Sequence, residues 1–351
     1  HGQVALNRFQ QMLSAGYSPN GVTYACILKA CGIIGALEVG EEIHHRILKY
    51  GLLEKDVVLA NSLVHMYTKC GALPKAQKVF DNLRVKPLES WTSLISGYTQ
   101  HGNSEAALRC YREMQNYGTT PSVVTFVCIL RACGNIGALN VGQEIEKQIE
   151  KEHLLQNNIV VGNALVDMYA KCGRLRKAEE VFQKLSMRNV ISWTTLIAGY
   201  VQHGYGLEAL SCFDQMQAHQ VSPNAVSLVC ALKACGIVRA LHKGLEIHGQ
   251  IRRDLVLEEN SLIVGALVYM YTRCNMIELA KEAFNKPALR DVTLWTTLIA
   301  GHVQNGCYEE AIDLFEKMLH EGHTPNAATY SSILKACGVI GTAEKGHTMF
   351  T

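Results

Sequence analysis

The sequence lacks the features that would place it in several common protein classes. No apolar run reaches the roughly 18 residues of a membrane-spanning helix, and no segment alternates apolar and polar residues long enough to predict a sheet. The 351 residues carry a net charge of only +2, which is less basic than many nucleic-acid-binding proteins. The first residues, HGQVALNRF, do not have the layout of a signal peptide. With 48% hydrophobic and 18% charged residues, the composition is that of a globular protein.

Motifs of catalysis and metal binding are missing as well. The 13 cysteines do not form the closely spaced pairs of zinc sites, since Cys26 and Cys31 lie five positions apart. Most recur at equivalent places along the chain, so we interpret them as small apolar packing residues in a reducing compartment. No histidine is followed two positions later by glutamate, as zinc deaminases require. We therefore predict no catalytic residue, no metal, no cofactor and no enzymatic activity.

What the sequence does contain is an internal repeat. Trp91, Trp193 and Trp295 are separated by a constant 102 residues, and cysteines and prolines recur at the same interval. Repeats of 35, 36 and 31 residues fill each interval. A fixed period of this kind is typical of repeat architectures, in which each repeat is one small supersecondary element.

The repeat boundaries follow from this period. A partial normal repeat (1–20) and a partial long repeat (327–351) flank nine complete repeats, so we expect the chain to be a piece of a longer array. The complete repeats are the long repeats 21–56, 123–158 and 225–260, the short repeats 57–87, 159–189 and 261–291, and the normal repeats 88–122, 190–224 and 292–326.

Each repeat is predicted to be a helical hairpin. In repeat 190–224, one apolar stripe contains Leu196 and Tyr200, a second contains Leu210 and Phe213, and glycines separate them. A hairpin of this size has no core of its own, so both stripes must be buried against neighbouring hairpins. We therefore predict an all-α fold, in which the whole chain forms a single right-handed α-solenoid superhelix of stacked helix-turn-helix repeats.

Two positions in each repeat vary while the packing positions recur. From residue 21 onward, the fifth residues are Ala25, Asn61, Thr92, Val127, Asn163, Thr194, Val229, Gly265, Thr296 and Ser331. The last residues of the nine complete repeats are Asp56, Pro87, Ser122, Asn158, Asn189, Asn224, Asn260, Asp291 and Asn326. Such residues could cap helices and form turns, or they could recognise a ligand. The residues alone leave both interpretations open.

The repeat lengths and motifs resemble those of the pentatricopeptide repeat family, in particular its plant-type subclass of alternating normal, long and short repeats. The resemblance rests on Val190–Ile197 (VISWTTLI), on the LKACG and LRACG of long repeats, and on Asn163–Gly173 (NALVDMYAKCG) of a short repeat. It covers the entire chain. Proteins of this family read RNA with one base per helical repeat, through two or three side chains. The resemblance therefore implies that the fifth and last residues of a repeat face one base.

Under this resemblance the normal and short repeats specify bases. The implied base-specifying residues are Asn61, Thr92, Ser122, Asn163, Asn189, Thr194, Asn224, Thr296 and Asn326. The threonine–asparagine pairs of repeats 190–224 and 292–326 imply adenine, the pair of repeat 88–122 implies a purine, and the pair of repeat 159–189 implies a pyrimidine. The pair of repeat 57–87 also favours a pyrimidine, although Pro87, its last residue, offers no side-chain hydrogen bond. The family's polarity implies the register 5′-N-Y-R-N-Y-A-N-N-A-N-3′ from residue 21 onward.

Other positions are implied to contribute less directly. The remaining fifth and last residues, which belong to long repeats or to pairs with a member that cannot hydrogen-bond, are Ala25, Asp56, Pro87, Val127, Asn158, Val229, Asn260, Gly265, Asp291 and Ser331. The residues at position two, which are implied to flank the base, are Val58, Val124, Val160, Ile191 and Val226. Glu89 and Thr293 depart from this apolar pattern and should stack less well. The long repeats are expected to act as spacers or as protein-binding faces.

Two ladders of basic residues recur between repeats. Lys69, Lys171 and Arg273 lie eight residues beyond the fifth position of the short repeats, about two helical turns away. We predict that these three residues contact RNA phosphates. The second ladder consists of Lys29, Arg131, Lys233 and Lys335. The alternative for both ladders is that they solvate an exposed helix face.

Two classes of function follow. The first is sequence-selective binding of single-stranded RNA, which in this subclass implies a specificity factor for C-to-U editing, or related RNA processing, in a mitochondrion or chloroplast. A deaminase would then act in trans or from a missing C-terminal extension, and an accessory editing factor could dock on the long repeats. The alternative is an α-solenoid scaffold that binds proteins and no RNA. The unequal repeat lengths favour the first class, because a constant period of 34 residues is typical of the second. No membrane association is expected.

Overall fold

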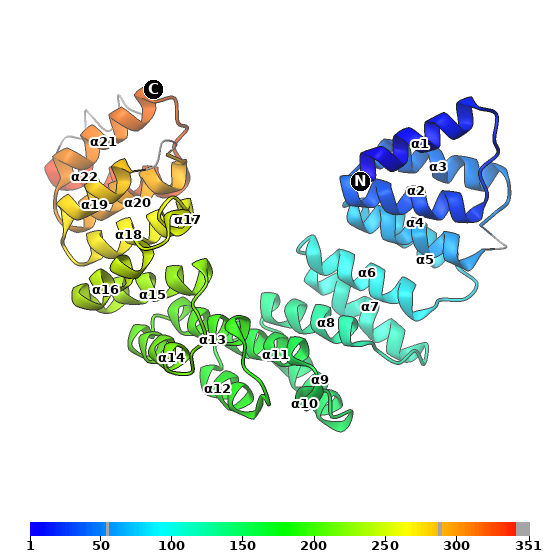
Figure 1. Ribbon diagram of the computed structural model, residues 1–351, viewed down its shortest axis with the longest axis horizontal. Coiled ribbons are helices and arrows are strands. Elements are labelled where there is room, and N and C mark those ends of the chain that lie inside the picture. The colour runs from blue at the N-terminus through cyan, green and yellow to red at the C-terminus, as the bar shows by residue number, and fades with distance from the viewer. Residues whose placement is uncertain (54–55, 287–289, 342–351) are drawn as a thin grey trace. The chain divides into compact units, whose positions relative to one another are not determined.

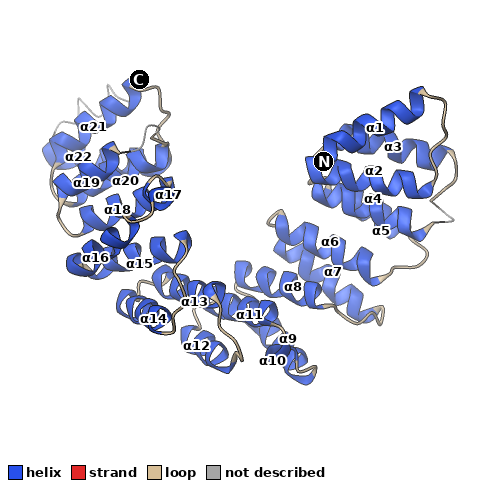
Figure 2. Cartoon of the chain, viewed as in Figure 1, coloured by secondary structure: helices blue, strands red, loops and turns tan. Residues whose placement is uncertain are grey.

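The computed structural model describes residues 1–53, 56–286 and 290–341. Within these residues every regular element is an α-helix (Figure 2). The chain divides into two compact segments, the N-terminal segment (His1–Ser186) and the C-terminal segment (Met187–Thr351). The end of the proposed partial repeat 327–351 lies outside the described residues.

The helices are short, with 4 to 14 residues each. Those of the N-terminal segment are α1 (Gly2–Ser14), α2 (Gly21–Ile34), α3 (Leu37–Lys49), α4 (Val57–Lys69), α5 (Leu73–Asp81), α6 (Leu88–Gln100), α7 (Ser104–Asn116), α8 (Val123–Ile136), α9 (Leu139–Lys151), α10 (Leu154–Asn157), α11 (Ile159–Lys171) and α12 (Leu175–Lys184). Those of the C-terminal segment are α13 (Val190–Gln202), α14 (Gly206–Ala218), α15 (Ala225–Val238), α16 (Leu241–Ile251), α17 (Leu255–Glu258), α18 (Ser261–Arg273), α19 (Ile277–Asn285), α20 (Val292–Gln304), α21 (Tyr308–His320) and α22 (Ala327–Ile340).

Each segment is a stack of helical hairpins. We call the helix that opens each proposed repeat its first helix; these are α2, α4, α6, α8 and α11 in the N-terminal segment and α13, α15, α18, α20 and α22 in the C-terminal segment. Within a segment, neighbouring first helices contact one another, and second helices pack on the first helix of their own repeat and of the next (Figure 1). This stacking of hairpins confirms the predicted all-α solenoid class.

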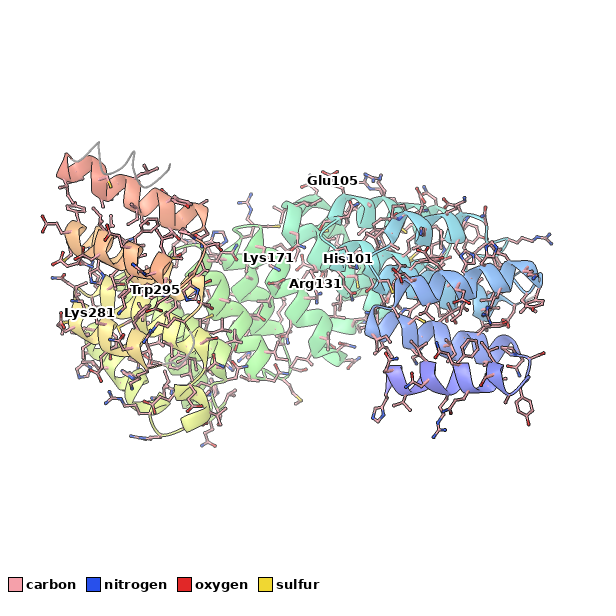
Figure 3. The ribbon with its side chains drawn as sticks, turned by 90° about the horizontal axis from the view of Figure 1, so that it is seen from above. His101, Glu105, Arg131, Lys171, Lys281 and Trp295 are labelled. Carbon is pink, nitrogen blue, oxygen red and sulfur yellow. The ribbon has the colours of Figure 1, made fainter. Side chains whose placement is uncertain are left out.

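The tryptophans fill the junctions between repeats. Trp91 and Trp295 are 2% and 0% exposed, and Trp295 lies within the C-terminal segment in Figure 3. Their rings stand edge-on to Phe80 and Phe284, at centroid distances of 4.6 and 4.7 Å. Each phenylalanine comes from the second helix of the preceding repeat. The aromatic contact therefore joins neighbouring hairpins, which a single hairpin could not bury alone.

The turns between the two helices of the short repeats require a left-handed backbone. Gly71 and Gly173 have φ angles of 76° and 71°, and Asn275 stands at the same place in the third short repeat with φ 60°. Glycine adopts this conformation without steric cost, and asparagine is among the few side chains that tolerate it. The replacement therefore keeps the turn.

The recurring cysteines of the long repeats lie in the interior. Cys31, Cys133 and Cys235 are all fully buried, and the cysteines of the chain are free thiols. Burial raises the pKa of Cys31 to about 11 and the pKa values of Cys133 and Cys235 to about 12. These thiols therefore stay protonated at neutral pH, as packing residues do.

Close approach of neighbouring helices depends on residues without a side chain. Gly301 of α20 faces Thr272 of α18, and a Cβ atom added to Gly301 would lie 2.5 Å from the Thr272 Cβ atom. Gly249 of α16 is also helical, but a Cβ atom there would meet nothing within 4 Å.

We expect Gly301→Ala to lower the free energy of unfolding by about 1–3 kcal/mol, because the added methyl group forces α18 and α20 apart. Gly249→Ala is the control and should be neutral or stabilising by up to about 1 kcal/mol, since alanine is the better helix former. Chemical denaturation of the two variants tests this. Equal effects of both substitutions would contradict the close-packing argument.

A buried imidazole links α16 to α18. The Nδ1 atom of His248 lies 2.6 Å from the Tyr271 hydroxyl. Burial, together with the positive charges of Arg252 and Lys286, lowers the pKa of His248 from 6.5 to about 4. The imidazole is therefore neutral at pH 7 in the folded protein.

The pH dependence of stability follows from this lowered pKa. The unfolded chain takes up a proton at His248 near pH 6.5 and the folded chain only near pH 4, so falling pH favours unfolding between these values. We expect the unfolding free energy of the wild type to fall across this window relative to that of His248→Gln, which does not titrate and can still hydrogen-bond Tyr271. Denaturant titrations at pH 7, 5.5 and 4 would show it. Parallel profiles of the two proteins would rule it out.

Candidate nucleic-acid interface

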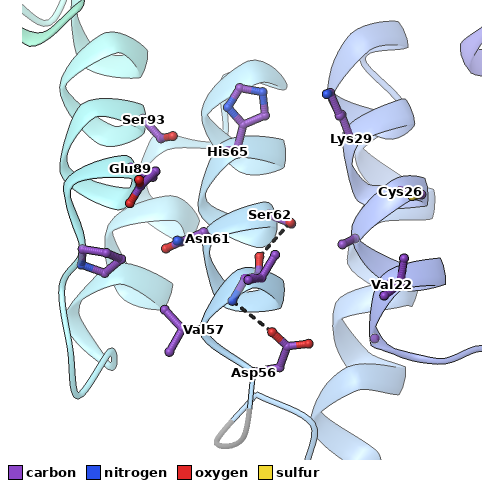
Figure 4. A pocket seen from close by; sticks show the side chains of 14 residues that line it. Val22, Cys26, Lys29, Asp56, Val57, Asn61, Ser62, His65, Glu89 and Ser93 are labelled. Carbon is purple, nitrogen blue, oxygen red and sulfur yellow. Dashed lines mark hydrogen bonds between the residues drawn. The ribbon is translucent and has the colours of Figure 1, made fainter. Parts of the chain in front are cut away.

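The first helices border three open grooves. One of about 970 Å³ lies along α2, α4 and α6 of the N-terminal segment (Figure 4). In the C-terminal segment, a groove of about 550 Å³ lies along α13, α15, α18 and α20, and a third of about 320 Å³ lies along α18, α20 and α22. All lining residues come from first helices or from the residue directly before one. We call them the first, second and third groove.

The grooves bring together predicted pairs of a fifth and a last residue. In chain order these pairs are Ala25 with Asp56 and Asn61 with Pro87 in the first groove, Gly265 with Asp291 in the second, and Thr296 with Asn326 in the third. Alanine, proline and glycine offer no side-chain hydrogen bond. Of these four pairs, the pair in the third groove alone has hydrogen-bonding side chains at both positions.

In repeats 159–189, 190–224, 261–291 and 292–326 the fifth residue is less accessible than the last, and in the other complete repeats both are half-buried. Asn163 and Thr194 are 9% and 8% exposed, whereas Asn189 and Asn224 are exposed. Among the other fifth residues, Ala25, Asn61, Thr92, Val127, Val229, Gly265 and Thr296 are half-buried and Ser331 is exposed. A ligand that reaches those four repeats therefore meets more of the last residue than of the fifth.

The last residue of a repeat caps the first helix of the next one. In eight of the nine complete repeats its side-chain oxygen accepts a hydrogen bond from a backbone N–H of the first helical turn, at Asp56, Ser122, Asn158, Asn189, Asn224, Asn260, Asp291 and Asn326. Pro87 cannot do so. The capping interpretation that the sequence left open is thus correct. It does not exclude recognition, because an asparagine that caps through its oxygen keeps both amide N–H groups for another partner.

Apolar side chains at position two of the repeats are exposed to solvent. Val58, Val124, Val160, Ile191 and Val226 are each more than half exposed. Val22 and Leu262 occupy the same repeat position and are 72% and 67% exposed. We did not predict these two residues from the sequence, although their repeat position was sufficient to find them. Exposed apolar groups beside a groove suit contact with a flat apolar surface.

The two basic ladders differ in their distance from the grooves. Lys69, Lys171 and Arg273 end α4, α11 and α18, where a cation also stabilises the helix C-terminus. Lys69 and Arg273 donate to glutamines of the next repeat at 3.3 and 3.2 Å, and Lys171 forms a 2.7 Å ion pair with Asp167. Figure 3 labels Lys171 of the first ladder and Arg131 of the second ladder.

The lining residues of the first and second grooves include Lys29 and Lys233 of the second ladder, but none of the three residues of the first ladder. Lys29 is one helical turn beyond the fifth residue of its repeat, whereas the first ladder is about two turns beyond, which is about 12 Å. Distance alone does not decide, because Ile237 and Gln304 also lie eight residues beyond a fifth residue and line the second and third grooves.

Other chemical sites do not emerge from the described part of the chain. It contains no group of three or more His, Cys, Asp or Glu residues placed to hold a metal ion. Among the described helices, none combines the length and the apolar character needed to cross a membrane. The grooves are therefore the candidate site that the described residues support best.

Known proteins match this chain along nearly its whole length. Residues 88–135, 188–236 and 290–338 match the PPR repeat family, and residues 58–87 and 163–190 match the PPR repeat. A chloroplastic pentatricopeptide repeat-containing protein of Arabidopsis thaliana is 35% identical over 340 residues, covering 97% of this chain and 55% of that protein. A mitochondrial one from the same plant is 33% identical over 323 residues, covering 92% and 58%. The chain thus spans about half the length of these relatives.

Solved structures share the fold. The chain is similar to the crystal structure of the pentatricopeptide repeat protein PPR10 in complex with an 18-nt psaJ RNA element, with a TM-score of 0.82 and 17% identity over 99% of this chain and 52% of that one. A crystal structure of PPR10 from maize gives a TM-score of 0.68 and 19% identity, covering 99% and 55%. At this identity the likeness describes the solenoid fold.

Capping by the last residue predicts how this position responds to substitution. We expect Asn224→Ala to lower the unfolding free energy by about 1 kcal/mol, because α15 loses the acceptor for its Ser227 N–H. Asn224→Asp should leave stability nearly unchanged, since aspartate caps as well as asparagine. Thermal denaturation midpoints measure both. A loss with Asn224→Asp as large as that with Asn224→Ala would show that the cap does not hold the helix.

Proposed function

Because this chain belongs to the pentatricopeptide repeat family, we propose that it binds single-stranded RNA and reads bases with the fifth and last residues of its normal and short repeats. The observation that carries the proposal is the third groove, where Thr296 and Asn326 line one cavity with hydrogen-bonding side chains from adjacent first helices. A groove of about 320 Å³ is large enough to take a base.

The cap on α22 determines which groups Asn326 offers to a base. Its Oδ1 atom accepts from the backbone N–H groups of Ala328 and Thr329, both at 3.0 Å. The amide Nδ2 atom is therefore left as a donor. Adenine N1 and cytosine N3 accept such a hydrogen bond, whereas guanine N1 and uracil N3 carry a proton and would oppose it. Asparagine at this position thus favours adenine or cytosine, and aspartate would favour guanine or uracil.

The fifth residue then selects by size and by polarity. The Thr296 hydroxyl donates its proton to the Val292 carbonyl at 2.7 Å, so towards a base its oxygen would act as an acceptor, for example for the amino group of adenine. Threonine is shorter than asparagine and leaves room for a purine. The longer Asn61 and Asn163 side chains reach farther towards a smaller pyrimidine. These arguments agree with the adenines assigned to repeats 190–224 and 292–326.

Stacking and charge complete the proposed binding mode. The exposed position-two side chains, such as Val58 in the first groove and Val226 in the second, would cover the faces of the bases. Lys29 and Lys233 in the grooves would approach phosphates, with Lys69, Lys171 and Arg273 farther along the same helices. With a net charge of only +2, the affinity should depend on salt less steeply than that of a strongly basic protein.

The finer role is also part of this proposal. The chloroplastic and mitochondrial names of the relatives support an organellar location. The order of normal, long and short repeats supports the plant-type subclass, in which the bound RNA would be positioned for C-to-U editing. The deaminase for that reaction would come from a partner or from another part of a longer protein. An accessory editing factor would bind at the long repeats, where Val127 and Val229 cannot read a base.

A binding titration tests base reading. We expect the chain to bind fluorescent RNA of the register 5′-N-Y-R-N-Y-A-N-N-A-N-3′, and to bind about tenfold more weakly for each of the two adenines changed to cytosine. The double variant Thr194→Asn/Asn224→Asp should shift the preference at the first of these adenines to uracil, because it offers a longer fifth residue and an acceptor that matches uracil N3–H.

The matched control is Asn260→Asp, which makes the same change in a long repeat and should leave base preference unaltered. Equal, weak binding of the wild type to all the RNAs would overturn base reading. It would favour the alternative of a protein-binding scaffold.

A further inference from the structure

A buried hydroxyl connects the two members of the pair in the third groove. The Oγ1 atom of Thr329, the third residue of the following repeat, lies 2.7 Å from the Thr296 Oγ1 atom and 3.1 Å from the Asn326 Oδ1 atom. The backbone N–H of Asn326 also donates to Thr329 Oγ1 at 3.2 Å. Thr329 has no exposed surface. The fifth and last residues of one repeat therefore share a hydrogen-bonding partner that lies beneath the groove.

The same connection occurs in the N-terminal segment. The Oγ1 atom of Thr125, again the third residue of the following repeat, lies 3.0 Å from Thr92 Oγ1 and 2.9 Å from Ser122 Oγ. The fifth residue of the short repeat 57–87 makes the same contact, since the buried hydroxyl of Ser90 in repeat 88–122 donates to the Asn61 Oδ1 atom. Two segments and two kinds of repeat thus show the same contact between a fifth residue and the third residue that follows it.

The sequence repeats this association at all nine junctions between successive repeats from residue 21 onward. A polar fifth residue is always followed by a hydroxyl at position three, in the combinations Asn61 and Ser90, Thr92 and Thr125, Asn163 and Ser192, Thr194 and Ser227, and Thr296 and Thr329. A fifth residue that cannot hydrogen-bond is always followed by an aliphatic side chain, in the combinations Ala25 and Leu59, Val127 and Val161, Val229 and Ile263, and Gly265 and Leu294.

Helix capping explains only part of this pattern. The hydroxyls of Thr125, Ser192, Ser227 and Thr329 each complete a capping box by accepting from the backbone N–H of the capping residue. Asp56, Asn158, Asn260 and Asp291 cap helices whose third residue is aliphatic, so a cap needs no hydroxyl there. Conversely, Ser90 follows Pro87, which has no side-chain cap, and its hydroxyl binds Asn61 instead. The presence of the hydroxyl therefore follows the fifth residue of the preceding repeat and not the capping residue.

Burial makes the hydroxyl costly unless it has a partner. Ser90, Thr125, Ser192, Ser227 and Thr329 are all fully buried, and an unpaired hydroxyl at such a place costs about 1–3 kcal/mol. At repeat 190–224 the arrangement is looser, because Ser227 bonds to Asn224 while the Thr194 hydroxyl donates to the Val190 carbonyl. The direct contact is therefore present in three combinations, Asn61 with Ser90, Thr92 with Thr125 and Thr296 with Thr329.

We propose that the third residue of the following repeat is a positioning residue for base reading, so that each reading site consists of three residues from two successive repeats. This inference rests on the proposed RNA-reading function. The buried hydroxyl holds the fifth residue in one rotamer and keeps the asparagine oxygen directed towards the helix. Without it, the Thr296 side chain loses the contact to Thr329 that helps to fix its rotamer, and the Asn326 amide loses one of the contacts that fix its orientation. Discrimination between adenine and guanine then weakens, because it depends on the Asn326 amide acting as a donor and the Thr296 oxygen acting as an acceptor.

The test is selectivity at one nucleotide. With RNA carrying adenine or guanine opposite repeat 292–326, the wild-type chain should prefer adenine, and Thr329→Val should reduce the ratio of the two Kd values by about fivefold to tenfold. Valine has the shape of threonine without the hydroxyl, so packing is kept. Thr329→Ser retains the hydroxyl and should restore most of the ratio. The preference opposite repeat 190–224 should not change in either variant.

A double-mutant cycle separates positioning from general destabilisation. If Thr329 acts through its neighbour, Thr329→Val should have little further effect on selectivity in a Thr296→Val background. The matched control is Val161→Thr, which adds a hydroxyl at position three after the apolar Val127. It should lower the thermal denaturation midpoint and leave base selectivity unchanged. Thr125→Val provides the same test opposite repeat 88–122 in the other segment.

The outcomes distinguish this inference from the function on which it rests. If the wild type itself does not distinguish adenine from guanine opposite repeat 292–326, base reading fails at that repeat. If the wild type does and Thr329→Val distinguishes them equally well, base reading stands and the positioning role is overturned. An equal loss of selectivity opposite every repeat in Thr329→Val would likewise overturn it, because that result reports unfolding.

Discussion

The structure depends on one constraint, which is that a hairpin of about 35 residues cannot bury both of its apolar faces by itself. Every repeat must therefore bury apolar side chains against its neighbours, as Trp91 does against Phe80 and Trp295 against Phe284. Neighbouring first helices are consequently held in a constant relation within each segment. That regular spacing leaves grooves between them, lined by the residues that open each helix. The candidate site is thus a consequence of how the repeats share their core.

Much of the fold could be predicted from the sequence because its signals are periodic. The interval between Trp91, Trp193 and Trp295 and the glycine-separated apolar stripes were sufficient for an all-α solenoid. The pairing of fifth and last residues came from the family resemblance, and four such pairs do line the grooves. The helix caps were open to prediction only as one of two alternatives, since asparagine before a helix suits both.

The rest depends on contacts between side chains that no local pattern reveals. The burial of Asn163 and Thr194 is set by the helices packed over them, so their residue types gave no sign of it. The basic ladder that lines the grooves is that of Lys29 and Lys233, which the spacing of the sequence did not distinguish from the other ladder. The hydroxyl of Thr329 reaches Thr296 from 33 positions away, across a repeat boundary. That relation becomes visible in the sequence only once the contact is known.

The capping role of the last residue also has a consequence for how such an array can change over time. Asparagine and aspartate begin a helix about equally well, so exchange of one for the other is nearly silent for folding. The same exchange replaces an outward-facing donor by an acceptor. Under the proposed base reading, mutation at this position would alter the preference of a repeat while the protein remains folded. Helix chemistry also limits the alphabet at this position to a few short polar side chains, and thereby the number of preferences that a repeat can acquire.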